Sequence, residues 1–222
     1  METDILNQLL TWDRNATLFV NGSENVYWDQ VIYVATSTWM WIPMGVVLLW
    51  LLWNNMTPRQ FCYAILFLAL AVLISDQLSS TIFKPVFQRW RPTRDPVYMY
   101  LFDVVHNYRG GRYGFFSAHA SNTFSIAVFL ACLIKNRKLN ILIISWSILN
   151  CYTRLYLGVH YLGDVLVGTA FGLIIGFGLA FLYRKYIGAD GPILKEKSVH
   201  LFSCTILGSY CLTFIVAAVA FL

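Results

Sequence analysis

The sequence predicts an all-α membrane protein: a polytopic helical bundle of about six transmembrane helices, preceded by an amphipathic helix in the membrane interface. The chain has 222 residues, of which 58% are hydrophobic and only 12% are charged. An ordinary soluble domain has about 25% charged residues. The hydrophobic residues form runs that are long enough, or nearly so, to cross about 30 Å of hydrocarbon as helices. The composition therefore excludes a soluble globular fold.

The order of the elements follows from these runs. Within residues 1–22, apolar side chains recur at helical spacing and predict the interfacial helix: Ile5, Leu9, Trp12, Ala16 and Phe19. The predicted spans are Val31–Trp53, Phe61–Phe83, Ser117–Ile134, Leu139–Leu157, Leu162–Tyr183 and Val199–Leu222. We expect a single domain over residues 1–222, in which 1–30 form the interfacial helix and 31–222 the bundle.

The charge and the cysteines limit the partners. A net charge of +5 is spread over short loops, which favours contacts with anionic lipid and disfavours nucleic acid. The five cysteines all lie in apolar stretches without the spacing of metal ligands. We interpret them as packing residues and predict neither disulfides nor a metal site. The sequence indicates no obligatory protein partner.

Six spans would divide the loops between the two sides of the membrane. Residues 54–60, 135–138 and 184–198 would lie on one side, and the termini, 84–116 and 155–161 on the other. The first set holds eight Lys and Arg residues but only two acidic residues. This excess predicts that the first set faces the cytoplasm and that the second set faces outward.

Three short polar stretches fall at the outer boundary. The first, KPVFQRWRP, places Lys84 and Arg91 seven residues apart at the end of the second predicted span. A helix would bring the two cations onto one face, but Pro85 and Pro92 disfavour a regular helix. Taken alone, this stretch is best interpreted as a basic anchor whose side chains reach the lipid headgroups. A phosphate site is the alternative.

The second and third stretches carry the histidines. In FFSAHASN, Ser117 can cap the third span, and His119 lies in its first turn beside unpaired N–H groups that can bind an anion. In TRLYLGVHYLGD, His160 and Asp164 are four residues apart and would meet on one helical face if the fifth span begins there. Together with Arg154, they form a polar group that is expensive to bury in so apolar a region, which indicates function.

The three stretches together resemble the signature of the type-2 phosphatidic acid phosphatases, whose superfamily includes glucose-6-phosphatase and the vanadium haloperoxidases. The family pattern is K-x6-R-P, then P-S-G-H, then S-R-x5-H-x3-D. This chain has Lys84-x6-Arg91-Pro92, then Phe116-Ser117-Ala118-His119, then Thr153-Arg154-x5-His160-x3-Asp164. Ala118 is the departure with the greatest consequence, since glycine at that place lets a backbone N–H approach phosphate closely. Alanine still supplies the N–H if its φ is negative.

The resemblance implies a role for each residue. His160, oriented by Asp164, would attack phosphorus and form a phosphohistidine, while His119 would protonate the leaving group and then activate water. Lys84, Arg91 and Arg154, with Ser117 and the N–H of Ala118, would hold the phosphate. No metal or other cofactor is implied. The remaining charges are less constrained: we interpret Arg89 as a headgroup anchor, and Asp76 as a partner of Arg154 or a residue lining a lateral entry.

The implied function is removal of a phosphate from a membrane lipid at the outer face of a bacterial cytoplasmic membrane. A lipid A phosphate, at the 1- or 4′-position, is the first candidate, because the basic, aromatic loop from Arg94 to Tyr113 could hold a polyanionic headgroup. Undecaprenyl diphosphate and phosphatidylglycerol phosphate are the alternatives. A vanadate-dependent haloperoxidase is disfavoured by the six spans, and a non-enzymatic lipid-binding or transport protein by the presence of both His119 and His160.

Overall fold

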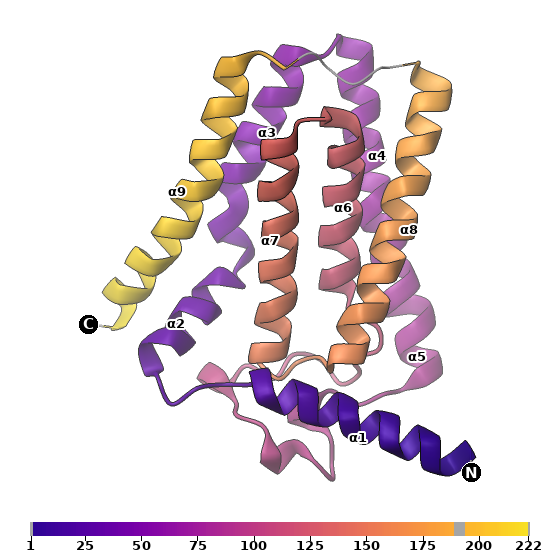
Figure 1. Ribbon diagram of the computed structural model, residues 1–222, viewed down its shortest axis with the longest axis vertical. Coiled ribbons are helices and arrows are strands. Elements are labelled where there is room, and N and C mark those ends of the chain that lie inside the picture. The colour runs from indigo at the N-terminus through magenta and orange to yellow at the C-terminus, as the bar shows by residue number, and fades with distance from the viewer. Residues whose placement is uncertain (1, 189–193, 222) are drawn as a thin grey trace.

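The structure, a computed structural model, describes residues 2–188 and 194–221 (Figure 1). Apart from loops and one isolated β-bridge between Trp90 and Tyr113, these residues are helical. Its α-helices are α1 (Glu2–Val20), α2 (Val26–Ala35), α3 (Ile42–Asn55), α4 (Pro58–Gln77), α5 (Lys84–Phe87), α6 (Ala118–Ile134), α7 (Arg137–Tyr156), α8 (Leu162–Ile187) and α9 (Glu196–Phe221). The predicted all-α class is confirmed. Residue 222, the end of the last predicted span, and residues 189–193 of the predicted 184–198 loop lie outside the described residues.

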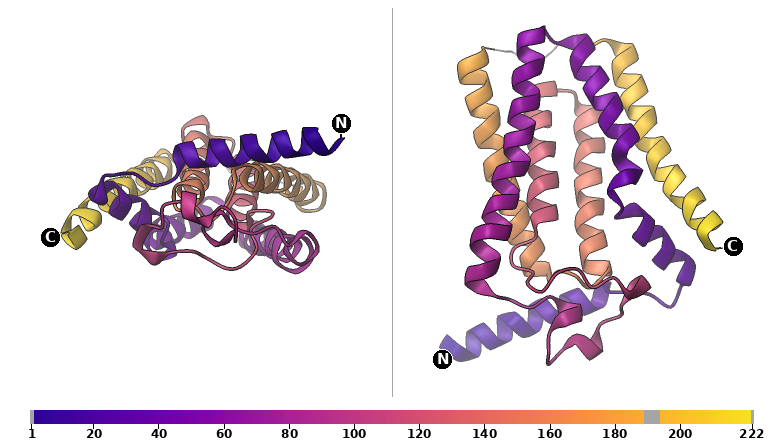
Figure 2. Two further views of the ribbon diagram at one scale, coloured as in Figure 1. Left: turned by 90° about the horizontal axis from the view of Figure 1, so that it is seen from below. Right: turned by 180° about the vertical axis from the view of Figure 1, so that it is seen from behind.

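Among the described residues, three segments have the length and hydropathy of membrane spans: Pro58–Phe87, Leu162–Ile187 and Glu196–Ala220. A fourth is formed if the bent pair Val26–Ala35 and Thr38–Asn55 is one span. The apolar helix α6 is shorter than these, and it stands with α7 between the outer helices of the bundle (Figures 1 and 2). A membrane bundle is therefore present, with three or four segments that qualify by length and composition.

The first predicted span, Val31–Trp53, is wrong as a single straight helix. The chain bends by 64° between α2 and the segment Thr38–Asn55. The break lies at Ser37: Thr36 ends α2, the Ser37 backbone is extended, and a 3₁₀ helix over Thr38–Trp41 then leads into α3. The indole N–H of Trp41 donates to the Ala35 carbonyl at 2.9 Å, which satisfies one of the acceptors left at the bend.

Helices α6 and α8 pack against each other through a row of small residues. Gly168, Gly172 and Gly176 recur every fourth residue on α8, and a Cβ on any of them would lie 2.5–2.8 Å from a backbone oxygen of α6. The oxygens belong to Ser117, Ser121 and Ser125. Small residues at this spacing let two membrane helices approach closely. The contact fixes the start of α6 against the start of α8.

The amphipathic helix α1 lies across the end of the bundle (Figures 1 and 2), and its large apolar side chains are exposed. Leu9 is 60% exposed, Trp12 62% and Phe19 92%, whereas Asp13 and Thr17 are buried against the bundle. A helix in water would turn the opposite face outward. This arrangement fits a helix whose apolar face enters lipid and whose polar face docks on the protein.

We predict that Gly172→Val destabilises the fold, because the added side chain meets the Ser121 backbone oxygen, which cannot move aside as a flexible side chain would. Overpacking of this kind costs about 1–3 kcal/mol. Thermal unfolding in detergent micelles, followed by tryptophan fluorescence, measures the loss. Gly178→Val is the matched control, since a Cβ at Gly178 of the same helix meets nothing within 4 Å. Equal midpoints for the two variants would contradict the packing argument.

Candidate active site

The three polar stretches meet at one end of the bundle, below the lower ends of the long helices in Figure 1. Lys84 begins α5, Ser117 caps α6, Arg154 lies in the last turn of α7, and His160 precedes α8 by two residues. Lys84 and Arg91 do not share a helical face. The helix ends at Gln88, whose φ is +45°, and Arg91 is extended. The spacing of the two cations therefore reflects a turn, not two helical turns.

His160 and Asp164 are paired, but not on one helical face. Helix α8 begins only at Leu162, so His160 stands in the preceding turn, and Asp164 is the third helical residue. One carboxylate oxygen, Oδ2, accepts from the Tyr161 N–H at 3.0 Å and lies 3.5 Å from His160 Nδ1. Both side chains are almost inaccessible to solvent, at 2% for His160 and 0% for Asp164.

Arg91 lies on the other side of the imidazole. Its Nη1 is 3.3 Å from His160 Nε2 and donates to the Val159 carbonyl at 3.1 Å, while its Nε donates to the Tyr113 carbonyl at 3.1 Å. Because a guanidinium has donors only, Nε2 must be the acceptor in this contact. Nδ1 then carries the proton, and Asp164 Oδ2 lies 3.5 Å from it without forming a hydrogen bond. This tautomer leaves a lone pair on Nε2, directed toward Arg91.

The surroundings keep the His160 ring neutral. Burial lowers the pKa of His160 well below its ordinary value of 6.5, and the positive charges of Arg91, Arg154 and Lys84 lower the pKa further. A neutral imidazole is the form that can act as a nucleophile. The same cations that would bind a phosphate therefore also keep Nε2 unprotonated.

Arg154 is the most deeply buried cation of the site, with 2% of its surface exposed. Its Nε and Nη2 each lie 3.3 Å from the Thr153 hydroxyl oxygen, and its Nη1 lies 3.5 Å from the Tyr108 hydroxyl. These partners are neutral, and no ion pair involves Arg154 among the described residues. A guanidinium that is buried without a carboxylate is costly unless an anion joins it.

The start of α6 offers backbone donors to such an anion. The Ser117 hydroxyl oxygen accepts from the Ala120 N–H at 3.4 Å, and the Ser117 N–H is already bonded to the Asp164 carbonyl. Ala118 is the first helical residue and has no positive φ, so its N–H points out of the helix end as glycine's would. His119 follows in the same turn, close enough to Arg154 for that positive charge to act on it.

Asp76 lies near Lys84 and not near Arg154. The Lys84 ammonium lies 3.4 Å from the Ser80 hydroxyl, which in turn lies 3.4 Å from Asp76 Oδ1. The three residues are spaced by four, along a helix that includes the π-helical segment Leu78–Phe83. The charge of Asp76 therefore acts on Lys84. Asp76 is therefore linked to the Lys84 ammonium through the Ser80 hydroxyl.

Comparison with known proteins identifies the family. Residues 60–188 match the family model of the PAP2 superfamily. The chain belongs to this superfamily. It is 35% identical, over 215 residues, to the lipid A 4′-phosphatase of Porphyromonas gingivalis, with 91% of this chain and 90% of that protein covered. It is 37% identical, over 203 residues, to the lipid A 4′-phosphatase of Bacteroides thetaiotaomicron, with 86% of this chain and 89% of that protein covered.

The PAP2 fold is also visible in three dimensions. The crystal structure of a transmembrane PAP2-type phosphatidylglycerolphosphate phosphatase from Bacillus subtilis superposes with a TM-score of 0.60. The match covers 81% of this chain and 88% of that one, at 19% sequence identity. It shows a shared bundle architecture.

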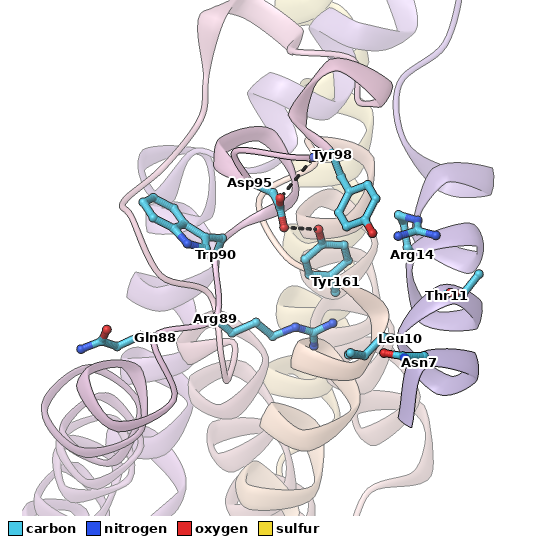
Figure 3. Close-up of a pocket in the computed structure, with 10 residues that line it drawn as sticks. All are labelled: Asn7, Leu10, Thr11, Arg14, Gln88, Arg89, Trp90, Asp95, Tyr98 and Tyr161. Atoms are coloured by element: carbon cyan, nitrogen blue, oxygen red, sulfur yellow. Dashed lines mark hydrogen bonds between the residues drawn. The ribbon is translucent and has the colours of Figure 1, made fainter. Parts of the chain in front are cut away.

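Arg89 is not the headgroup anchor that the sequence indicated. Its Nη1 donates to Asp164 Oδ1 at 2.7 Å, and its Nη2 donates to Asp13 Oδ2 of α1 at 2.5 Å. Burial alone would lower the pKa of Arg89, but the neighbouring charges of Asp164 and Asp13 outweigh it and raise the pKa. The guanidinium also lies 4.4 Å from the centre of the Tyr161 ring (Figure 3). Arg89 therefore ties the buried carboxylate to α1.

Helix α1 also caps α8. Asp13 Oδ1 accepts from the Gly163 N–H at 2.7 Å, and the Thr17 hydroxyl accepts from the Leu162 N–H at 2.9 Å. These are N–H groups of the first turn of α8, which have no partner within their own helix. Asp13 and Thr17 are absent from the PAP2 pattern, and nothing in their local sequence distinguishes them from other polar residues of an amphipathic helix.

Gly114 is a second residue that the motifs did not reveal. Its N–H donates to the Arg89 carbonyl at 2.8 Å, and a Cβ in its place would lie 2.8 Å from Asp164 Oδ2 and 3.5 Å from His160 Nδ1. Any side chain at this position would enter the contact between the histidine and the carboxylate. A glycine is required here because Asp164 and His160 lie close to the Gly114 backbone. The loop sequence around Gly114 does not reveal this contact.

We predict that Arg89→Gln lowers kcat and leaves KM nearly unchanged, because Arg89 holds Asp164 and lies away from the Nε2 side of His160, which Arg91 contacts. Misplacement of a catalytic group by about 1 Å costs on the order of 10²-fold in rate. Steady-state kinetics in mixed micelles measures both constants. Arg89→Lys should recover part of kcat, since it restores one charge to the pair.

Arg14→Gln is the matched control for this variant. Arg14 lines the same cavity of about 380 Å³ as Arg89 (Figure 3) but stacks on the Tyr98 ring at 4.0 Å. The Arg14→Gln variant should retain the wild-type kcat. A rise in KM at constant kcat for Arg89→Gln would instead restore the interpretation of Arg89 as a headgroup anchor.

Proposed function

We propose that this protein is a membrane lipid phosphatase that removes the 4′-phosphate of lipid A. The observation that carries the proposal is the His160 ring held between a buried carboxylate and a guanidinium, with the Nε2 lone pair directed toward the guanidinium. Membership of the PAP2 superfamily supports the phosphatase activity. The names of the two relatives, at 35% and 37% identity over most of the chain, support the 4′-phosphate over the 1-phosphate and over undecaprenyl diphosphate.

The proposed reaction has two steps. In the first, Nε2 of His160 attacks phosphorus, the ester P–O bond breaks, and the sugar oxygen leaves with a proton from His119. In the second, His119 removes a proton from water, the resulting hydroxide attacks phosphorus, and the P–Nε2 bond breaks to release inorganic phosphate. Asp164 stabilises the positive charge that develops on the imidazole in the first step.

Charge stabilisation in both steps would come from cations of the chain. Lys84, Arg91 and Arg154 lie close enough to His160 for their charges to act on it, and donors fixed in a water-poor site stabilise a transition state strongly. The hydroxyl of Ser117 and the N–H of Ala118 would add neutral donors at the end of α6. The proposed reaction therefore requires no metal ion.

We further propose that the bundle crosses the membrane six times, with the active site facing outward. Support comes from the position of α6 and α7 between helices that have the length and hydropathy of membrane spans, and from the distribution of charge between the loops at the two ends of the bundle. The α3–α4 and α6–α7 connections, the C-terminal end of α8 and the N-terminal end of α9 lie at one end, opposite α1 and the polar stretches (Figure 1). The former carry the excess of Lys and Arg that is typical of the cytoplasmic side. The site would then lie at the periplasmic face of a bacterial inner membrane.

This topology predicts the labelling of two single cysteines, introduced into a chain whose five native cysteines have been replaced. An impermeant thiol reagent added to intact spheroplasts should label Asp103→Cys, and should label Lys138→Cys only after the membrane is permeabilised. Both positions are exposed at opposite ends of the bundle. Labelling of both cysteines from the same side would contradict the proposed number of spans.

The catalytic proposal predicts distinct losses for three variants. His160→Ala should remove essentially all turnover while the folded protein still binds the lipid, and Asp164→Asn should lose on the order of 10⁴-fold in kcat because the imidazole takes the wrong tautomer. His119→Ala should lose more on a phosphate ester than on undecaprenyl diphosphate, whose leaving group is stable without a proton. Each kcat is measured on both lipids, with trapping of ³²P-labelled protein.

Two outcomes would contradict this assignment. Accumulation of label on His160→Ala to the level of the wild type would exclude His160 as the nucleophile. Small and equal losses in all three variants would indicate a lipid-binding protein with incidental hydrolysis. A wild-type preference for undecaprenyl diphosphate over lipid A would move the proposal to the other substrate while leaving the mechanism intact.

A further inference from the structure

A second pocket, with a volume of about 360 Å³, lies in the loop that joins α5 to α6. It is lined by Trp90, Thr93, Arg94, Met99, Arg109 and Arg112. Three of the six residues are arginines and none is acidic. We refer to it as the arginine pocket. Neither the PAP2 pattern nor the mechanism above makes use of these residues.

The three guanidinium groups have only neutral partners. Arg94 Nε donates to the Gly110 carbonyl at 3.0 Å, and Arg109 Nη1 donates to the Thr93 carbonyl at 2.6 Å. Arg112 stacks on the Trp90 ring, 4.6 Å from its centre. Among the described residues no carboxylate forms an ion pair with any of the three. Three like charges around one cavity repel each other, and an anion placed between them removes that cost.

Thr93 provides an independent sign of a ligand. The residue is fully buried and lines the arginine pocket, yet its hydroxyl oxygen has no hydrogen-bond partner among the described residues. Its methyl group faces Gly158, where a Cβ would lie 2.7 Å away. A buried hydroxyl without a partner is costly and rare. A phosphate oxygen in the pocket would supply the missing acceptor.

The arginine pocket shares a wall with the candidate active site. The Gly110 carbonyl accepts from Arg94, and on the other side a Cβ at Gly110 would lie 2.8 Å from Arg91 Nη1. The Arg91 N–H also donates to the Arg112 carbonyl at 3.3 Å. One thin segment of backbone therefore separates the cation that contacts His160 from the cations of the pocket. A headgroup whose two anionic groups are spaced to match these neighbouring sites would reach both.

We propose that the arginine pocket binds a second phosphate group, carried by the same lipid headgroup whose first phosphate is cleaved at His160. The inference rests on the proposed lipid phosphatase function and narrows the substrate to a headgroup with two phosphates. Arginines suit this task because their planar donors match phosphate oxygens. The pocket does not take part in bond breaking, so its contribution is to affinity and to the orientation of the headgroup.

The test compares two substrates that differ only in the second phosphate: lipid A with phosphates at the 1- and 4′-positions, and lipid A with the 4′-phosphate alone. The variants Arg94→Gln and Arg112→Gln of the full chain are assayed for kcat/KM on both, in mixed micelles. We expect each variant to lose about 10-fold on the bisphosphorylated lipid, the usual effect of one charge-assisted contact. On the monophosphorylated lipid, kcat/KM of each variant should stay within about 2-fold of the wild-type value.

Arg59→Gln is the matched control. It removes the same charge from a residue at the opposite end of the bundle, where Arg59 stacks on Tyr63, and it should leave both substrates unaffected. Equal losses of the pocket variants on both lipids would overturn the proposal, since the arginines would then act through Arg91. Unchanged rates on both lipids would overturn it as well.

Free phosphate is the other source of the same chemistry, and it is tested separately. Inhibition by inorganic phosphate is measured with the monophosphorylated lipid as substrate. Weaker inhibition in the pocket variants, without any loss on the bisphosphorylated lipid, would assign the pocket to free phosphate and overturn the proposal. The wild-type rate on the monophosphorylated lipid reports on the lipid phosphatase function itself. The proposed phosphatase function and the proposed role of the arginine pocket can therefore fail independently.

Discussion

The Asp164 side chain is fully buried where α8 begins, and a carboxylate in such a place has to be compensated by its neighbours. It receives Arg89 from the loop after α5, the N–H of Tyr161 and the ring of His160. Its own main-chain carbonyl accepts from Ser117 at the start of α6. Three segments that are distant in the sequence are thereby fixed around one residue, and the imidazole is oriented by the same contacts that hold the end of the bundle together.

This arrangement needs a rigid support, which the apolar part of the chain provides. The glycines of α8 let α6 and α8 pack closely, and this packing fixes the position of the capping residue Ser117 relative to the carboxylate of Asp164. Helix α1 adds a restraint from the other side, because its polar residues cap α8 and bind Arg89 while its apolar residues face outward. Binding of that apolar face to lipid would stabilise the docked helix. Membrane contact and the geometry of the histidine are therefore linked through Asp13 and Arg89.

The residues of the motifs could be found from the sequence, but their geometry could not. Residue types and spacing identified Lys84, Arg91, His119 and His160, yet the helical-face argument failed for His160 because α8 starts two residues later. Arg89 was misinterpreted, since its partners Asp13 and Asp164 are 76 and 75 residues away, and no local pattern encodes such a contact. By contrast, the glycines at every fourth position of α8 are visible in the sequence and mark a helix–helix contact.

A second phosphate held in the arginine pocket has a consequence for which bond is broken. Because that phosphate is bound equally well before and during the reaction, its binding lowers KM but accelerates the chemical step only through orientation. Orientation is what a headgroup with two similar phosphates requires. The wall formed by Gly110 sets the separation of the two sites, so a headgroup that fills both can present only one of its phosphates to His160 Nε2. Two anion sites would select a headgroup with two phosphates, whereas the choice between its two positions has to come from the sugar that carries the reacting phosphate, because exchanging the two phosphates leaves their separation unchanged.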